Sequence, residues 1–132
     1  MLYQASRALL TPSQGICHCT HCQKFTRSTY LIFGMIPYEN FAFTTGQPTP
    51  FTFTHKAGPK IHVSRCSECG VAICKGMGGD DSVIIVFART LDDGETTLAK
   101  MPQVELWNVD RIAWCGQVGK GAMGQFEGFP PS

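Results

Sequence analysis

Short stretches of the chain alternate between apolar and polar residues, with the period of two that an extended strand requires. In segment 51–54 two Phe residues fall on one face and two Thr residues on the other, and in segment 61–64 Ile and Val alternate with His and Ser. Further apolar runs have the length of a strand and end at turn-forming residues. The pattern predicts strands at 30–36, 41–44, 51–54, 61–64, 71–74, 83–88, 104–108 and 111–114.

Turn compositions separate these runs, and no segment shows a convincing helical period. The turns read TGQP at 45–48, AGP at 57–59, GMGGDD at 76–81 and DDG at 92–94. Short strands separated by such turns predict a small all-β sandwich or barrel-like fold. The sequence shows no repeat and no linker, so we expect one domain over residues 1–132, with an irregular Gly- and Pro-rich tail from about residue 116.

Five of the seven cysteines lie in two tight groups. Cys17, Cys19 and Cys22 belong to the stretch Cys-His-Cys-Thr-His-Cys, and Cys66 and Cys69 to Cys-Ser-Glu-Cys-Gly. This spacing can turn several sulfurs toward one point, and thiolates are preferred ligands of tetrahedral zinc. The sequence therefore predicts zinc as a cofactor. Disulfides or buried apolar thiols are the alternatives, and the odd count and local spacing disfavour disulfides.

The balance of charged residues limits the kinds of molecule that the protein is expected to bind. The chain has 11 Lys and Arg against 10 Asp and Glu, a formal charge of +1, which gives no electrostatic footprint for nucleic acid or an anionic membrane surface. The first ten residues lack the features of a signal peptide, and no apolar run reaches transmembrane length. We expect a cytoplasmic protein with a small-molecule substrate. The sequence leaves open whether the protein forms a homodimer.

Several motifs, taken in order, resemble one known family. They are CHCTHCQK at 17–24, FAFTTGQP at 41–48, RCSECGVAI at 65–73, RTLDDG at 89–94, and VELW at 104–107 with a second Trp at 114. This order is similar to that of the glutathione-dependent formaldehyde-activating enzyme family, which includes the centromere protein V type domains. The resemblance implies a small zinc-bearing fold of the β-tent type. It also implies an activity classed as a carbon-sulfur lyase, the condensation of formaldehyde with glutathione.

The resemblance further implies a catalytic zinc held by Cys17, Cys19 and Cys22. A second, structural zinc would be held by Cys66 and Cys69 together with a Cys-x-Cys on the first strand. The sequence departs from the family here, because segment 2–10 reads LYQASRALL and has no cysteine. The second pair could then recruit another cysteine, join the first three around one metal, or bind nothing. The cysteines available for recruitment are Cys74 and Cys115.

Three residues are candidates for catalysis. If the first three cysteines converge, we expect His18 and His21 to turn outward as surface or pocket-lining residues, available for proton transfer rather than as ligands. After the metal motif the family usually has a pair of small residues ending in Gly, whereas this sequence has Arg27, whose guanidinium could pair with a carboxylate or an enolate if the loop borders the zinc. The alternative is that Lys24 and Arg27 are solvated loop charges.

Other histidines and cysteines have simpler expected roles. We expect His55 and His62 to be exposed strand residues, Cys74 to be a small buried hydrophobe, and Cys115 to be a free thiol. Three thiolates would leave a fourth zinc position open, which is typical of a catalytic site. Taken with this open position, the resemblance implies chemistry on a glutathione adduct of a small carbonyl compound. The alternatives are isomerisation, addition or elimination on another small molecule, and a zinc-stabilised binding module without catalysis.

Overall fold

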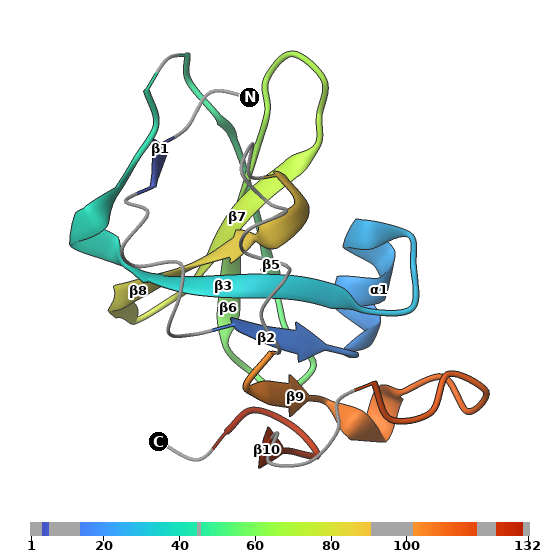
Figure 1. The fold of residues 1–132 in the computed structure, drawn as a ribbon. Coiled ribbons are helices and arrows are strands. Elements are labelled where there is room, and N and C mark those ends of the chain that lie inside the picture. The colour runs from blue at the N-terminus through green and yellow to red at the C-terminus, as the bar shows by residue number, and fades with distance from the viewer. Residues whose placement is uncertain (1–3, 6–13, 45, 91–101, 119–123, 131–132) are drawn as a thin grey trace.

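The computed structural model describes residues 4–5, 14–44, 46–90, 102–118 and 124–130 (Figure 1). The described part is built mainly from strands, in agreement with the all-β prediction, and one short helix joins the second strand to the third. The strands are β1 (Gln4–Ala5), β2 (Gln14–Cys17), β3 (Leu31–Pro37), β4 (Phe41–Ala42), β5 (Thr49–Thr54), β6 (Lys60–Arg65), β7 (Ala72–Met77), β8 (Asp80–Phe87), β9 (Val104–Leu106) and β10 (Gly124–Gln125). The helix is α1 (Thr20–Thr26), and the 3₁₀ turns are η2 (Tyr38–Asn40), η3 (Ala88–Thr90) and η4 (Asn108–Asp110).

Eight strands form one sheet in the order β10-β9-β2-β3-β8-β7-β6-β5, and β1 pairs with β4 in a separate ribbon. Pairing is antiparallel except at β9, which runs parallel to both β2 and β10. The predicted strand at 111–114 is wrong, because the chain after β9 enters η4 and then a turn at 113–115. There the backbone N–H of Cys115 bonds back to the Ile112 carbonyl at 2.9 Å instead of joining a ladder.

The large sheet bends over its own core. Ile61 and Val63 of β6 belong to the same buried cluster as Leu31 and Phe33 of β3, although β8 and β7 separate those strands in the sheet. Contact across two intervening strands requires strong curvature, and Figure 1 shows β2 and β3 crossing β6 and β7 steeply. Apolar side chains buried between the two halves supply the main driving force for this arrangement.

A second buried cluster lies farther along β7 and β8. It contains Ile36, Cys66, Ile73, Cys74, Ile84 and Val86. Within the described residues, no helix has the length and hydropathy needed to cross a membrane.

Candidate metal centre

Three cysteine sulfurs meet in the interior of the protein. Cys17 is the last residue of β2, Cys19 immediately precedes α1, and Cys22 lies in the first turn of that helix. All three are buried, and their Sγ atoms lie within 4.8 Å of one another. In the described part of the chain, this is the one group of three or more Cys, His, Asp or Glu side chains gathered so closely. The structure therefore brings the predicted trio together.

Helix α1 aims two of these sulfurs. The sequence predicted no helix, and this was wrong: the Sγ of Cys19 accepts a hydrogen bond from the backbone N–H of Cys22 at 3.3 Å and caps the helix. A side-chain oxygen of Ser, Thr, Asp or Asn usually has this role. The helix ends at Arg27, whose φ of 53° lies in the left-handed region. Because Cys19 and Cys22 flank the first turn, both sulfurs face Cys17 at the end of β2.

The proximity of the three thiols shifts their pKa values apart. The pKa of Cys17 is raised mainly by its hydrogen-bonding contact with Cys19 and next by that with Cys22, because both favour its neutral thiol. The pKa of Cys19 is lowered mainly by Cys17 and next by Cys22, because both contacts favour its thiolate. Zn–S bonds of about 2.3 Å in a tetrahedral site place sulfurs roughly 3.8 Å apart. The observed limit of 4.8 Å is compatible with that spacing. A buried set of soft sulfur donors therefore fits zinc.

The second cysteine pair forms a tight turn between β6 and β7. The N–H of Gly70 donates to the carbonyl of Cys66 at 2.8 Å, and a φ of 78° at Gly70 closes the turn. The pKa of Cys66 is lowered, first by the backbone N–H of Cys69 and then by that of Glu68, which are directed at its sulfur. All seven cysteines and all four histidines lie within the described residues, and none of the others completes a metal-sized group with this pair.

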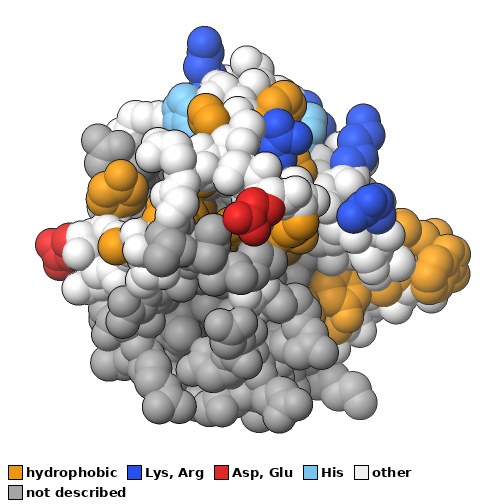
Figure 2. All heavy atoms as spheres, turned by 90° about the horizontal axis from the view of Figure 1, so that it is seen from above, with side chains coloured by type: hydrophobic (Ala, Val, Ile, Leu, Met, Phe, Trp, Pro, Cys, Tyr) orange, Lys and Arg blue, Asp and Glu red, His pale blue; other side chains and the backbone are white. Residues whose placement is uncertain are grey.

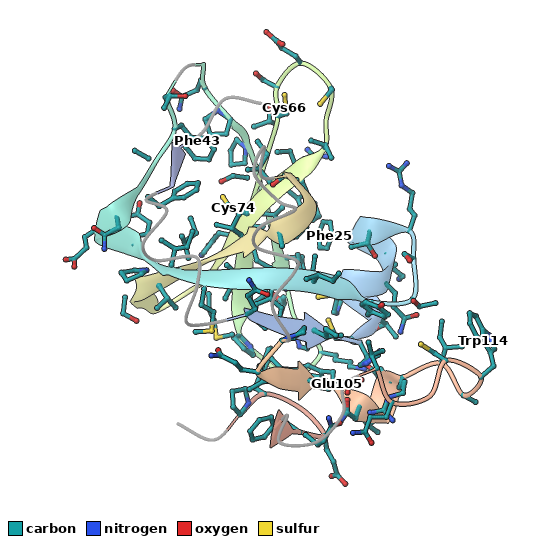
Figure 3. The ribbon with its side chains drawn as sticks, viewed as in Figure 1. Phe25, Phe43, Cys66, Cys74, Glu105 and Trp114 are labelled. Carbon is teal, nitrogen blue, oxygen red and sulfur yellow. The ribbon has the colours of Figure 1, made fainter. Side chains whose placement is uncertain are left out.

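Neither of the two cysteines proposed for recruitment completes a metal-sized group with Cys66 and Cys69, although Cys74 shares the second core cluster with Cys66. Cys74 is fully buried in the second core cluster, as expected for a small hydrophobe, and burial raises its pKa to about 11. Cys115 is half-buried in the turn after η4. Figure 3 shows Cys66 at the opposite end of the molecule from Glu105, which lies on β9 beside the trio's strand β2. Neither a merged five-cysteine site nor recruitment of Cys74 or Cys115 is seen.

The family model described as glutathione-dependent formaldehyde-activating enzyme matches residues 3–110. The chain belongs to this family. A search of the curated proteins finds no match. The family match includes both cysteine groups and β9, and it ends before the turn that carries the exposed Trp114. The trio is therefore the buried, metal-sized sulfur cluster of a formaldehyde-activating family member.

His18, between two cysteines of the trio, is fully buried, and the expectation that it turns outward was wrong. Its Nε2 lies 2.6 Å from Oε1 of Glu105, whose side chain is also fully buried. His18 is held from the other side by its backbone, since its N–H donates to the carbonyl of Leu106 at 3.0 Å. These contacts fix the linker between Cys17 and Cys19 against β9.

His55 is buried as well, with 3% of its surface exposed, so the prediction of an exposed strand position was wrong. Its Nδ1 accepts the backbone N–H of Ala57 at 3.0 Å, and a neutral ring must then carry its proton on Nε2. A protonated Nε2 cannot bind a metal. His55 instead helps to lower the pKa of Cys19, although Cys17 and Cys22 have larger effects. The contact between His55 and Cys19 does not have the geometry of a full hydrogen bond, because Nε2 of His55 has no hydrogen-bond partner among the described residues.

His21 is half-buried at the edge of the same region. Its ring lies 4.7 Å from that of Phe53 and 4.9 Å from that of His55, measured between centroids. Burial and then the neighbouring His55 lower the pKa of His21, which keeps its ring neutral. Of the two histidines in the motif, only this one is near solvent.

A lysine approaches the trio from β7. The Nζ of Lys75 donates to the Sγ of Cys22 at 3.3 Å. Burial alone would lower the pKa of Lys75, but the charges of Cys22, Cys17 and Cys19 outweigh that effect and raise it. The ammonium therefore stays charged against the sulfurs. No sequence motif marked Lys75, because the predicted strand ended one residue before it.

Arg27 lies at the surface rather than among the sulfurs. It helps to line an open hollow of about 420 Å³ on the outer side of α1, and no cysteine of the trio lines that hollow. Both cations of the hollow are exposed, and the full lining is Thr20, Gln23, Lys24, Arg27, Ser28 and Thr29. Figure 2 shows Lys and Arg side chains spread over the described part of one face, with an acidic side chain close to them.

Glu105 and Asp110 are further residues that the sequence did not single out. Asp110 accepts the N–H of Thr20 at 3.3 Å through Oδ2 and forms an ion pair with Lys56, so η4 is fastened to the start of α1. Asp110 also receives the side-chain amide of Gln23 on its backbone carbonyl at 3.1 Å. An acidic residue on an otherwise apolar strand was the available signal for Glu105. Nothing local marked Asp110.

Proposed function

We propose that this protein is a zinc enzyme that makes and breaks the carbon–sulfur bond in a thiol adduct of a small carbonyl compound, with glutathione and formaldehyde as the first pair to test. The observation that carries this proposal is the buried trio of sulfurs, within 4.8 Å of one another, in a chain of the formaldehyde-activating family. Cys17, Cys19 and Cys22 would hold the metal.

Three protein sulfurs are one ligand short of a tetrahedral set. Zinc with one open position supplies a place where a substrate thiol is held as its thiolate or where a carbonyl oxygen is polarised. The described residues support an open position, since Nδ1 of His55 already accepts the N–H of Ala57, which leaves the proton of a neutral ring on Nε2, and Nε2 of His18 is directed at Glu105.

The reaction itself needs no oxidant. The sulfur of the thiol forms a bond to the carbonyl carbon, the π bond of the carbonyl breaks, and the proton that left the thiol ends on the former carbonyl oxygen. Reversal expels the thiol and restores the carbonyl. His21 is a candidate to move this proton, because it belongs to the cysteine motif and its half-buried ring is near solvent.

The cationic hollow supports an acidic thiol as substrate. Lys24 and Arg27 are exposed there and could bind carboxylates, of which glutathione has two. The same hollow also supports a second candidate function, catalysis at the metal on a different acidic small molecule by isomerisation, addition or elimination. The absence of cysteine in segment 2–10 is a further departure from the family that favours this alternative.

The test combines metal analysis with an exchange assay. Purified, reduced protein is analysed for zinc, and exchange between ¹³C-labelled formaldehyde and its glutathione adduct is followed by NMR. We expect close to one zinc per chain, and exchange faster than without protein. Cys22→Ala should lose both the metal and the acceleration, because two thiolates hold zinc poorly against chelators. Cys74→Ala is the matched control and should keep both, since that thiol lies in the second core cluster.

Three results would count against the proposal. Retention of full zinc by both Cys19→Ala and Cys22→Ala would show that the trio is not the metal site. Two zinc ions per chain would contradict the expected count. A zinc-loaded wild type without acceleration, tested also with other acidic thiols, would favour the redirected function or a binding module.

A further inference from the structure

Lys75 occupies an unusual position for a lysine. It lies on β7 opposite Val63 of β6 and Ile85 of β8, so it shares a face with residues of the main core cluster. A surface lysine extends its ammonium into water, whereas this one directs Nζ at the Sγ of Cys22, 3.3 Å away. Among the described residues, the Sγ of Cys22 is the hydrogen-bond partner of the Lys75 ammonium. The ion pairs formed by these residues involve other side chains, so no carboxylate is paired with Lys75 there.

Placing an ammonium against a core is costly unless an anion accompanies it. Three thiolates around a divalent metal carry a net charge of minus one, because three negative charges exceed two positive ones. Lys75 supplies the single positive charge that brings this group to zero. With an anionic fourth ligand, the metal and its four ligands would carry a net charge of minus two. Including Lys75, the net charge of the whole group would be minus one.

We propose that Lys75 is a positioning residue that selects an anionic fourth ligand, namely a thiolate, over neutral ligands at the metal centre. This inference rests on the proposed function, since it requires a metal on the trio. Lys75 has no lone pair while charged and therefore acts through its field and its hydrogen bond to Cys22, not as a ligand. Hydrogen bonding to Cys22 also withdraws charge from that sulfur, which strengthens the attraction between the metal and an incoming anion.

The experiment uses the protein loaded with cobalt(II), whose sulfur-to-cobalt absorption reports the fourth ligand directly. The wild type, Lys75→Met and Lys60→Met are titrated at pH 8 with 2-mercaptoethanol, which binds as a thiolate, and with imidazole, which is neutral. Met matches the length of Lys without its charge. Lys60 is exposed on β6 and provides the control for loss of a distant positive charge.

We expect Lys75→Met to bind the thiol roughly ten- to a hundredfold more weakly, as removal of a charge roughly 6 to 12 Å from the ligand predicts at an effective dielectric constant of about 20. Imidazole binding should change less than about threefold. Lys60→Met should leave both affinities unchanged. Lys75→Arg, which keeps the charge, should recover part of the thiol affinity and provides a second folded variant if Met disturbs the core.

Equal weakening for thiol and imidazole, or no change for either, would overturn the role of Lys75. Equal loss of thiol affinity in Lys75→Arg and Lys75→Met would also overturn it, because the charge would then be irrelevant. Failure of the proposed function is distinguishable: a cobalt-loaded wild type that shows thiol selectivity without formaldehyde exchange contradicts the reaction alone. A wild type that binds no metal contradicts both.

Discussion

His18 and Glu105 lie 87 positions apart in the chain and share a 2.6 Å hydrogen bond in which neither side chain is exposed. The carboxylate is held from other directions as well. Its Oε1 accepts the backbone N–H of Val118 at 3.2 Å, and its Oε2 accepts the side-chain amide of Gln125 at 3.0 Å. One carboxylate thus joins the cysteine motif to β9, to β10 and to the segment after the 113–115 turn.

Removal of this carboxylate should destabilise the fold strongly. We expect Glu105→Ala to lower the free energy of unfolding by about 3 to 5 kcal/mol, because the imidazole of His18 and nearby donors would be left buried without their acceptor. Urea denaturation of the reduced protein measures the loss. Glu127→Ala is the control, since Glu127 is exposed and its removal should cost less than about 0.5 kcal/mol. Equal unfolding midpoints for the two variants would contradict the role given to Glu105.

The comparison between sequence and structure is clearest at the trio. Spacing alone predicted that Cys17, Cys19 and Cys22 converge, because ligand spacing is local and residues so close in sequence have few ways to share a metal. The helix between them was missed, since a cysteine sulfur supplies its N-cap and the helix has only seven residues. The burial of His18 was missed for a different reason. Its partner on β9 is remote in sequence, and only the parallel pairing of β9 with β2 brings the two together.

Strand alternation likewise could not place His55 or Lys75. His55 was expected to be an exposed strand residue, because a polar residue is expected to face solvent, and the predicted strand at 71–74 ended one residue before Lys75. The bend of the sheet reverses that expectation, because residues of β6 and β7 come to face the trio from the opposite half of the core. Curvature of this kind depends on contacts across the whole sheet, so a single sequence does not reveal it.

Gly15 of β2 provides a test of the packing beneath the trio. A Cβ at this position would lie 2.4 Å from Cζ of Phe33 and 2.8 Å from Cγ2 of Val104, so a side chain must shift. We expect Gly15→Ala to cost about 1 to 3 kcal/mol of stability through overpacking. Gly34→Ala on β3 is the matched control, because nothing lies within 4 Å of its added Cβ. Alanine there should be neutral or stabilising by about 0.5 kcal/mol. Equal thermal midpoints for the two variants would show that β2 adjusts freely.

Cys74 should make stability depend on pH in the alkaline range. Burial raises its pKa from the ordinary 9.0 to about 11, so above pH 9 the unfolded thiol releases its proton while the folded one keeps it. Stability from this group is thus fully present below pH 9 and decreases as pH rises toward 11, by about 3 kcal/mol in all. The measurement compares unfolding free energies of the wild type and Cys74→Ala from pH 8 to 11. The difference between the two should shrink or reverse with pH, and parallel curves would contradict the buried neutral thiol.

Arg27 can be tested in a way that separates its charge from its backbone. It occupies the left-handed region at the end of α1, with φ of 53°, where Gly is favoured. We therefore expect Arg27→Gly to keep its zinc and to gain up to about 1 kcal/mol of stability. If its guanidinium binds a carboxylate of glutathione from the hollow, the same variant should lose roughly tenfold in kcat/KM, less than a buried pair would lose because the side chain is exposed.

The decisive comparison for Arg27 is between two thiols. Glutathione carries carboxylates and 2-mercaptoethanol does not, so loss of the guanidinium should slow only the reaction with glutathione. Arg27→Lys keeps the charge but loses the planar fork of donors, and it should recover part of the rate. Lys24→Ala, on the same hollow, should weaken glutathione use in the same direction. A more stable Arg27→Gly protein with unchanged kcat/KM for both thiols would assign Arg27 to the solvated end of the helix and leave substrate binding to residues nearer the trio.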